Sequence, residues 1–431
     1  MMEGQTPDSQ LVRVLGVREL TASIVNTTIG AGIFVLPAAV AMGLGAAAPI
    51  AYLVCGALMT LIVLCFAAAG SRVSLTGGLY AYIEVAFGGF AGFAGGVFFW
   101  STACFSVASV ATAFAGSLGA IWAPLGTGVF RALALACLFG VLAVVNVRGV
   151  KPGIRLVEAI TLAKLAPLLV LLAVGIWSVN PEYLKFSMPS LTQVGQASIL
   201  LIFAFEGIEV ALMPVGEVKD PARTVPRAIL GALALTTAIY LAIQAIAQGI
   251  LGPELSRFAD APLAETAFRL IGPAGKGLVL AGATVSMFGY VCGDTLGTPR
   301  ALFALGRDGA LPSVLARVHP RFHTPAVAIV VYAVVVTALS ISSSFTQLAV
   351  LANVSGLLLY ALAVGASYEL QRRDVRMAGK PFNLPGGITI QALALAGIVW
   401  FVSQATRREF VIEAGVLAAA SCYYLVRRRW R

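Results

Sequence analysis

The chain has 431 residues, of which 59% are hydrophobic and only 11% are charged, and its mean hydropathy is +0.93. Because a soluble domain usually carries about 25% charged residues, this composition leaves too little polar surface to solvate a globule and excludes a soluble protein. The net charge of +10 comes from Lys and Arg in short loops between apolar runs, where they set membrane topology, so no nucleic-acid partner is expected.

Apolar runs long enough to cross a bilayer recur along the whole sequence. They predict an all-α integral membrane protein with about twelve transmembrane helices and no sizeable soluble domain. The predicted spans are 20–42, 46–70, 79–115, 129–147, 155–178, 195–215, 226–251, 276–305, 325–343, 346–369, 387–406 and 410–426. The third and eighth runs exceed the bilayer thickness, which indicates tilt or extension beyond it.

Lys and Arg are concentrated in the loops on one side of these spans, for example around Arg148 and Arg372 and in the basic C-terminal end. By the positive-inside rule this side is cytoplasmic. We therefore expect a multi-pass protein of the cell (inner or plasma) membrane with both termini in the cytoplasm. The polar N-terminal segment shows no cleavable signal peptide. The longest outward connection, 252–275, contains an amphipathic stretch, Leu263 to Ile271, that is a candidate helical cap over the outer mouth.

Metal and enzyme chemistry has little support in the sequence. The six cysteines fall inside apolar runs without metal-ligand spacing. His319 and His323 have a spacing found in metal sites but lie in a Pro-rich loop without Cys or acidic neighbours. Neither a Walker motif nor a nucleophile elbow is present. We expect no metal, no cofactor and no enzymatic activity.

Two predicted spans contain helix breakers near their middle. The first reads Ile29-Gly30-Ala31-Gly32-Ile33-Phe34 before Pro37, and the sixth reads Phe203-Ala204-Phe205-Glu206-Gly207-Ile208-Glu209 before Pro214. Unwinding frees backbone groups that hydrocarbon cannot satisfy, so they must line a cavity or hold a ligand. Freed amides suit a carboxylate and freed carbonyls suit an ammonium, which together fit the zwitterionic end of an amino acid. The alternative is that Gly30 and Gly32 only permit close helix packing.

Ionisable residues inside spans are the second signal, because they are costly in a membrane and mark function by default. Lys164 lies in the middle of the fifth span, although its ammonium could also snorkel to the interface. Glu206 and Glu209 share a helical face only if the helix continues through Gly207. Asp294 in the eighth span could bond Lys164 or cap a local irregularity. Lys164, Glu209 and Asp294 are the candidates for proton coupling.

Five motifs in chain order resemble those of the amino acid–polyamine–organocation permeases, and the resemblance covers nearly the whole chain. They are Ile29–Phe34 with Pro37, Thr76–Tyr82, Phe203–Glu209, Glu217–Ile229 and Arg300–Pro312. The resemblance implies a LeuT-type 5+5 inverted repeat with two extra C-terminal helices. The expected segments are a cytoplasmic N-terminal segment 1–19, a first repeat 20–178, a second repeat 195–369, two further helices 387–426 and a cytoplasmic basic tail 427–431.

The resemblance also implies roles for individual residues. The amides of Ala31 and Gly32 would hold the substrate carboxylate, and the carbonyls of Ile29, Phe203 and Glu206 its ammonium. Lys164 matches a lysine that takes the place of a sodium ion in sodium-independent members. The candidate substrate site comprises Ile29, Gly30, Ala31, Gly32, Phe203, Ala204, Phe205, Glu206 and Gly207. Glu206 departs from the family pattern, where this position is often apolar or small and polar, so its carboxylate either faces the substrate side chain or points elsewhere.

These observations predict a secondary active amino acid transporter that works by alternating access, is sodium-independent and proton-coupled, and favours neutral amino acids. Its partners would be the amino acid, protons and the lipid bilayer. An exchanger, or an exporter of cationic amino acids or polyamines with Glu206 as the counter-charge, is the alternative within the same class. A channel would need filter loops or charged rings, which the sequence does not show.

Overall fold

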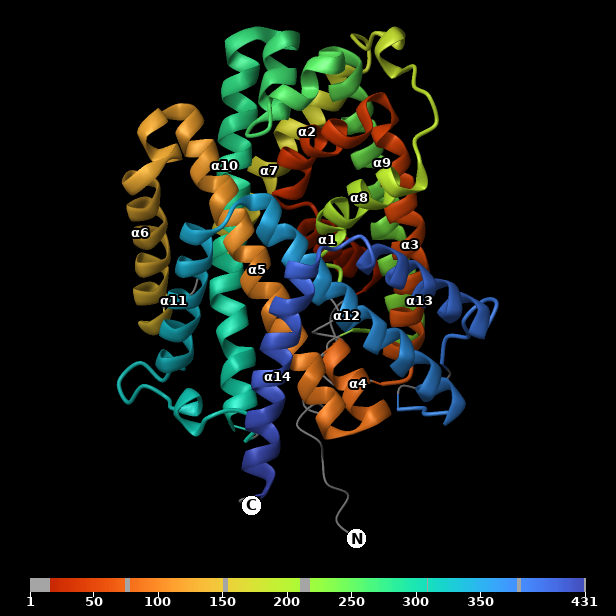
Figure 1. The fold of residues 1–431 in the computed structure, drawn as a ribbon, viewed down its shortest axis with the longest axis vertical. Helices are drawn as coiled ribbons and strands as arrows, with labels where there is room; N and C mark the ends of the chain where they lie inside the picture. The colour runs from red at the N-terminus through yellow and green to blue at the C-terminus, as the bar shows by residue number, and fades with distance from the viewer. Residues whose placement is uncertain are drawn as a thin grey trace.

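The computed structural model describes residues 16–73, 78–149, 154–209, 218–307, 309–377 and 381–429. In these residues the chain is a bundle of α-helices joined by short turns (Figure 1). The α-helices are α1 Val17–Thr28, α2 Gly32–Leu44, α3 Ala48–Gly70, α4 Leu79–Phe87, α5 Gly89–Ile121, α6 Gly128–Val147, α7 Ile154–Gly175, α8 Leu191–Leu201, α9 Pro221–Leu251, α10 Pro262–Arg307, α11 Ala326–Ser342, α12 Phe345–Arg372, α13 Ile388–Val402 and α14 Arg407–Arg429.

The predicted all-α character is confirmed, since every predicted span overlaps one of these helices or a consecutive pair of them. The end of the sixth span at 210–215, residues 1–15 of the N-terminal segment and residues 430–431 of the tail lie outside the described residues. Positions 74–77, 217 and 308, which belong to or border the family motifs, lie outside them as well.

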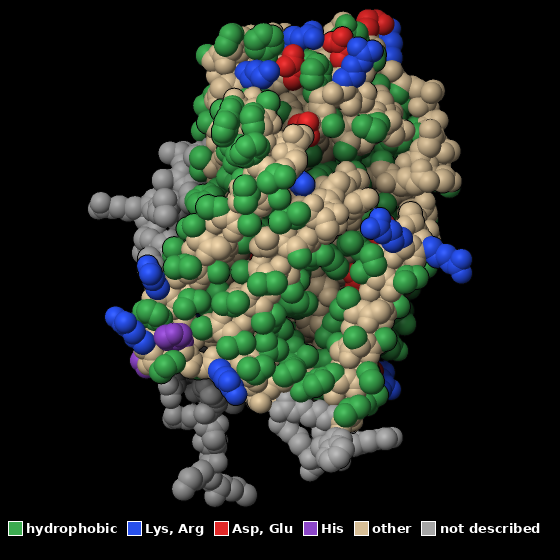
Figure 2. All heavy atoms as spheres, turned by 60° about the vertical axis from the view of Figure 1, so that its left-hand side comes forward, with side chains coloured by type: hydrophobic (Ala, Val, Ile, Leu, Met, Phe, Trp, Pro, Cys, Tyr) green, Lys and Arg blue, Asp and Glu red, His purple; other side chains and the backbone are tan. Residues whose placement is uncertain are grey.

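Seven helical stretches of the described chain are long and apolar enough to cross a bilayer. Four shorter apolar helices accompany them: Lys164–Gly175, Leu191–Phe205, Ala326–Ser342 and Ile388–Val402. Figure 2 shows a face on which hydrophobic side chains spread over the middle while many charged ones gather near one end. The outward-facing hydrophobic residues of α6, including Val129 and Leu133, are well exposed, as expected for contact with lipid. The chain is therefore a multi-pass membrane protein.

Of the two long predicted runs, the third is interrupted and the eighth is not. The third run consists of α4 and α5, which meet at Gly88 with φ +85°. The eighth run, 276–305, lies within α10 and is a continuous helix, because the kink of α10 at Ile271 and Gly272, where φ is −132° and +69°, falls before the run begins. The predicted amphipathic stretch is the helical part of α10 before this kink. Its Leu263 lines a small cavity together with Phe34 of α2.

The helices pack so that α1, α2 and α8 lie inside the bundle (Figure 1). α5 packs against α10 and α12, while α9 packs against α1 and α3. α2 contacts α8 and α10, so the second half of the first predicted span is enclosed by other helices. α6 and α11 lie together at one side of the bundle.

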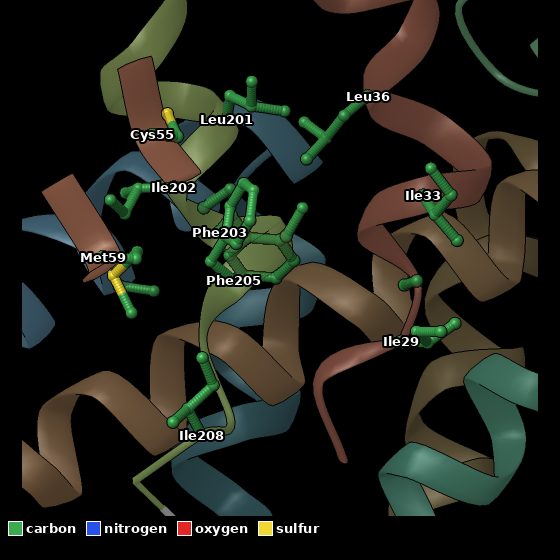
Figure 3. Packing of buried hydrophobic residues seen from close by; sticks show 14 of the residues in the cluster. Ile29, Ile33, Leu36, Cys55, Met59, Leu201, Ile202, Phe203, Phe205 and Ile208 are labelled. Atoms are coloured by element: carbon green, nitrogen blue, oxygen red, sulfur yellow. The ribbon is translucent and has the colours of Figure 1, made fainter. Parts of the chain in front are cut away.

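Both predicted helix breaks are confirmed. α1 ends at Thr28, Ile29 leaves the helix with ψ 87°, and α2 begins at Gly32. In the sixth span α8 ends at Leu201 and tightens into the short 3₁₀ helix η5, Ile202–Phe205, after which Glu206 is extended with ψ 155°. Figure 3 shows Ile29 and Ile208 on non-helical stretches of backbone, with Ile33 and Leu36 on the helix that follows the first break.

Candidate functional site

The two helix breaks lie directly against each other, and glycine makes this approach possible. Gly207 has φ +101°, and a Cβ there would sit 2.9 Å from the carbonyl oxygen of Thr27 at the end of α1. A Cβ on Gly32 would sit 3.0 Å from Cα of Ala204 in η5. Since any larger residue would collide with backbone at both points, these glycines let the two unwound segments touch.

A single tyrosine of α9 connects the two breaks. The hydroxyl of Tyr240 lies 2.9 Å from the carbonyl oxygen of Thr28 and 2.8 Å from that of Ala204. Its one proton can be donated to either carbonyl, and the ring is fully buried edge-on against Phe205. Nothing in the sequence singles out Tyr240, because an aromatic residue in an apolar run is indistinguishable from ordinary packing.

Side chains of other helices donate hydrogen bonds to carbonyls at the end of α8, where the sixth-span break begins; the carbonyls of Ser198 and Leu200 also accept from the amide of Ile202. The side-chain amide of Asn353 in α12 donates to the carbonyl of Ile199 at 2.6 Å and reaches that of Leu200 at 3.3 Å. The thiol of Cys55 in α3 donates to the carbonyl of Ser198 at 3.4 Å. Unwound backbone in a membrane needs such partners, so Asn353 and Cys55 support the break without facing the ligand. The sequence did not single out either residue for this role.

Lys164 bonds the end of α1. Its side chain is only 7% exposed, and its ammonium donates a hydrogen bond to the carbonyl of Asn26. In an unbroken helix this carbonyl would accept from Gly30, but the amide of Gly30 donates to Thr28 instead, at 2.9 Å. The lysine therefore occupies a place opened by the break, and it does not snorkel to the interface.

Asp294 has partners other than Lys164. Its carboxylate accepts hydrogen bonds from the hydroxyl of Thr298, at 2.9 Å, and from that of Tyr332 in α11. Of the two sequence-based alternatives for Asp294, the structure thus shows local bonds within α10 and to α11 rather than a bond to Lys164.

Glu206 and Glu209 do not share a helical face, because the backbone is not helical at Gly207. Glu209 is buried, and it accepts from the amide of Gly207 at 3.1 Å and from the hydroxyl of Tyr360 at 2.7 Å. Glu206 is partly exposed and accepts from the hydroxyl of Ser106 in α5 at 2.9 Å. The carboxylate of Glu209 thus bonds within the break, while that of Glu206 extends toward α5.

The two glycines of the first break have different surroundings. Gly32 is packed against η5, which fits the helix-packing alternative, but Gly30 is partly exposed and a Cβ there would meet its nearest atom, Cδ2 of Tyr290, only at 3.9 Å. The first N–H groups of an α-helix have no acceptor within their own helix, and in α2 the amide of Phe34 donates to the carbonyl of Ala31 at 3.0 Å, just before the helix. Space beside Gly30 and the amino-terminal end of α2 together fit a small anionic group.

The remaining predicted site residues surround this crossing. Ile29, Ala31, Phe203, Ala204 and Phe205 are all buried there. The described residues contain no cluster of three or more His, Cys, Asp or Glu side chains suited to a metal ion. The ring Nδ1 of His319 accepts hydrogen bonds from the backbone amides of Arg321 and Phe322 in a turn.

Two interrupted membrane helices in contact at their breaks, with a buried lysine bonded to a carbonyl beside one of them, are typical of membrane carriers. The sequence matches the model of the amino acid permease family over residues 15–413. The chain belongs to this family, whose members are transporters and not enzymes.

Individual relatives span nearly the same length. The chain is 32% identical over 439 residues to an uncharacterised transporter of Mycobacterium tuberculosis, covering 98% of this chain and 92% of the relative. It is 29% identical over 440 residues to the serine/threonine exchanger SteT of Bacillus subtilis, covering 98% and 99%. It is 27% identical over 411 residues to the branched-chain amino acid permease BcaP of Bacillus subtilis, covering 90% and 87%.

Proposed function

We propose that this protein is a secondary active amino acid transporter that works by alternating access in the inner or plasma membrane, with both termini in the cytoplasm. The observation that carries the proposal is the direct contact of the two unwound segments, at Gly207 with Thr27 and at Gly32 with Ala204. A site built from backbone amides and carbonyls recognises the ammonium and carboxylate that all amino acids share.

The proposed architecture has twelve membrane helices, with inverted repeats at 20–178 and 195–369 followed by two helices within 387–426. The positions of the breaks support it, since each lies in the first helix of its repeat. Interrupted helices at matching positions of two halves are typical of transporters with this symmetry.

Within the site, the amides of Ala31 and Gly32 hold the substrate carboxylate, and the carbonyls of Ile29, Phe203 and Glu206 hold its ammonium. Tyr240 supports this division of roles. Its hydroxyl can donate a hydrogen bond to the carbonyl of Thr28 or of Ala204. The neighbouring carbonyls of Ile29, Phe203 and Glu206 are then available to accept from the substrate ammonium.

We further propose that Lys164 replaces sodium and links transport to protons. Charged, its ammonium holds the end of α1 through Asn26; neutral, it releases that half-helix. The position of α1 then depends on whether Lys164 is protonated. Such a dependence is the least that coupling of transport to protons requires. Glu209 and Asp294, each bonded by a tyrosine hydroxyl, are the further candidates for carrying a proton.

Counterflow in liposomes tests the carrier proposal. Purified protein is reconstituted in sodium-free buffer with a high internal concentration of one amino acid, and uptake of the same labelled amino acid is followed. A carrier gives a transient accumulation above equilibrium for at least one of the twenty amino acids. Simple equilibration, or the absence of any flux across the whole panel, contradicts the proposal.

An exchanger is the second candidate, because SteT, which is similar over its whole length, is named a serine/threonine exchanger. Net uptake into empty liposomes separates the two mechanisms. An exchanger shows uptake only when an internal amino acid is present, whereas a proton symporter also accumulates substrate in empty liposomes under an inward proton gradient.

A further inference from the structure

The carboxylate of Glu206 is incompletely satisfied by the protein. Its Oε2 accepts from Ser106 at 2.9 Å, and no ion pair within the described parts of the chain includes it. A carboxylate can accept about four hydrogen bonds. Glu209 and Asp294, by contrast, each have two donors. Of these carboxylates near the breaks, Glu206 has the most capacity left for a ligand.

The other carboxylate oxygen of Glu206, Oε1, lies beside Gly356, and the hydroxyl oxygen of Thr102 lies near the same glycine. A Cβ placed on Gly356 of α12 would sit 3.0 Å from Oε1 of Glu206, and 3.6 Å and 3.7 Å from Cγ2 and Oγ1 of Thr102 in α5. Thr102 is only 7% exposed, and among the described residues its Oγ1 is buried without a hydrogen-bond partner. Two oxygens from different elements thus converge beside a residue that has no side chain. We call Glu206, Thr102 and Gly356 the side-chain subsite.

The charges near the breaks favour a cationic occupant. The described residues there carry the carboxyl groups of Glu206, Glu209 and Asp294 but only one amine, that of Lys164, which is bonded to Asn26. Burying an unpaired carboxylate is costly, and a charge-assisted hydrogen bond from a cation offsets this cost. A substrate amine or guanidinium supplies the charge and more than one donor, whereas a hydroxyl supplies one donor and no charge.

We propose that the side-chain subsite binds the positively charged side-chain end of a cationic amino acid, such as lysine, ornithine or arginine. The inference rests on the proposed function, because the backbone at the breaks must hold the common end of the same amino acid. It selects the cationic alternative over the neutral substrates that the sequence favoured. Glu206 and Thr102 are then the specificity-determining residues.

Matched ligand pairs test the proposal on the purified protein. Binding affinity is measured for lysine against norleucine, and for arginine against citrulline, because each pair differs chiefly in charge. A hydrogen bond to a charged group contributes about 1.5–3 kcal/mol, so the cationic member of at least one pair should bind about tenfold tighter or better. Glu206→Gln should reduce this ratio to near one by weakening the cationic ligand, and Thr102→Val should reduce it in part.

Glycine variants of α12 provide a matched comparison. Gly356→Ala places a methyl group 3.0 Å from Oε1 of Glu206 and should weaken cationic ligands, whereas Gly365→Ala meets only Phe87, at 3.5 Å, and should not. Equal affinity for both members of each pair in the wild type overturns the subsite, as does an equal loss for both members in Glu206→Gln. If only neutral amino acids bind and exchange, the subsite is wrong and the proposed function stands. If no amino acid binds, both are wrong. If Glu206→Gln does not fold, the affinities of the wild type and of Gly356→Ala for the two ligand pairs still test the side-chain subsite.

Discussion

Removing the hydroxyl of Tyr240 should weaken substrate binding as well as the fold. Tyr240→Phe keeps the buried ring and its contact with Phe205 but deletes the donor shared by the carbonyls of Thr28 and Ala204. One buried carbonyl then loses its partner, at a cost of about 1–3 kcal/mol. Because both carbonyls belong to the unwound segments, the loss falls on the arrangement that holds the ligand, and affinity should drop by a factor of roughly 5–150.

Tyr52→Phe is the matched control. Tyr52 in α3 is also fully buried, lies edge-on to Tyr240 at 6.4 Å, and donates to the side-chain oxygen of Gln244 at 3.1 Å, away from the breaks. Both variants should lose similar thermal stability without ligand, and only Tyr240→Phe should lose substrate-dependent stabilisation in a thermal-shift titration. If the two variants bind substrate equally well, the hydroxyl of Tyr240 does not contribute to binding, and its proposed role in bridging the two breaks is refuted.

Four further substitutions follow from the same geometry. In sodium-free liposomes an inward proton gradient should drive accumulation by the wild type but not by Lys164→Ala; sodium-dependent uptake by the wild type would show that Lys164 does not replace the ion. Gly207→Ala should lower thermal stability and abolish transport, because φ is +101° and the added methyl group meets the carbonyl oxygen of Thr27 at 2.9 Å; wild-type transport would contradict the contact. Gly30→Leu should leave a folded protein that does not bind substrate, because the atom nearest to an added Cβ is 3.9 Å away. Gly32→Leu should also destabilise the fold, because its side chain would collide with Ala204. Unchanged affinity in Gly30→Leu would show that the substrate carboxylate binds elsewhere.

The sequence predicted the helical fold, both breaks and the burial of Lys164 because each has a local signal. Apolar runs mark spans, and glycine followed by proline marks interruptions at Gly30 and Gly207. A lysine in the middle of an apolar run stands out in the same way. The sequence did not separate Gly32, which packs tightly on Ala204, from Gly30, which is loosely packed against Tyr290, because that difference depends on segments far away in the chain.

The residues that support the breaks could not be found from the sequence. Tyr240, Asn353 and Cys55 act through hydrogen bonds to carbonyls of distant segments. In a membrane protein, lipid-facing and interior residues are both apolar, so hydropathy does not show which face of α9 or α12 is turned inward. The same limit applies to Thr102 and Ser106, which look like ordinary small residues of a packing interface until α5 is placed beside Glu206.

The central claim is that the crossed unwound segments recognise the common end of an amino acid through backbone groups. The most direct measurement is the affinity of the purified protein for its best-bound amino acid, compared with the carboxamide and the N-acetyl derivative of that amino acid. Losing either the carboxylate or the ammonium should weaken binding by about tenfold or more, because each removes a charged hydrogen-bonding group. Derivatives that bind as tightly as the parent amino acid would place recognition outside the two breaks and contradict the account.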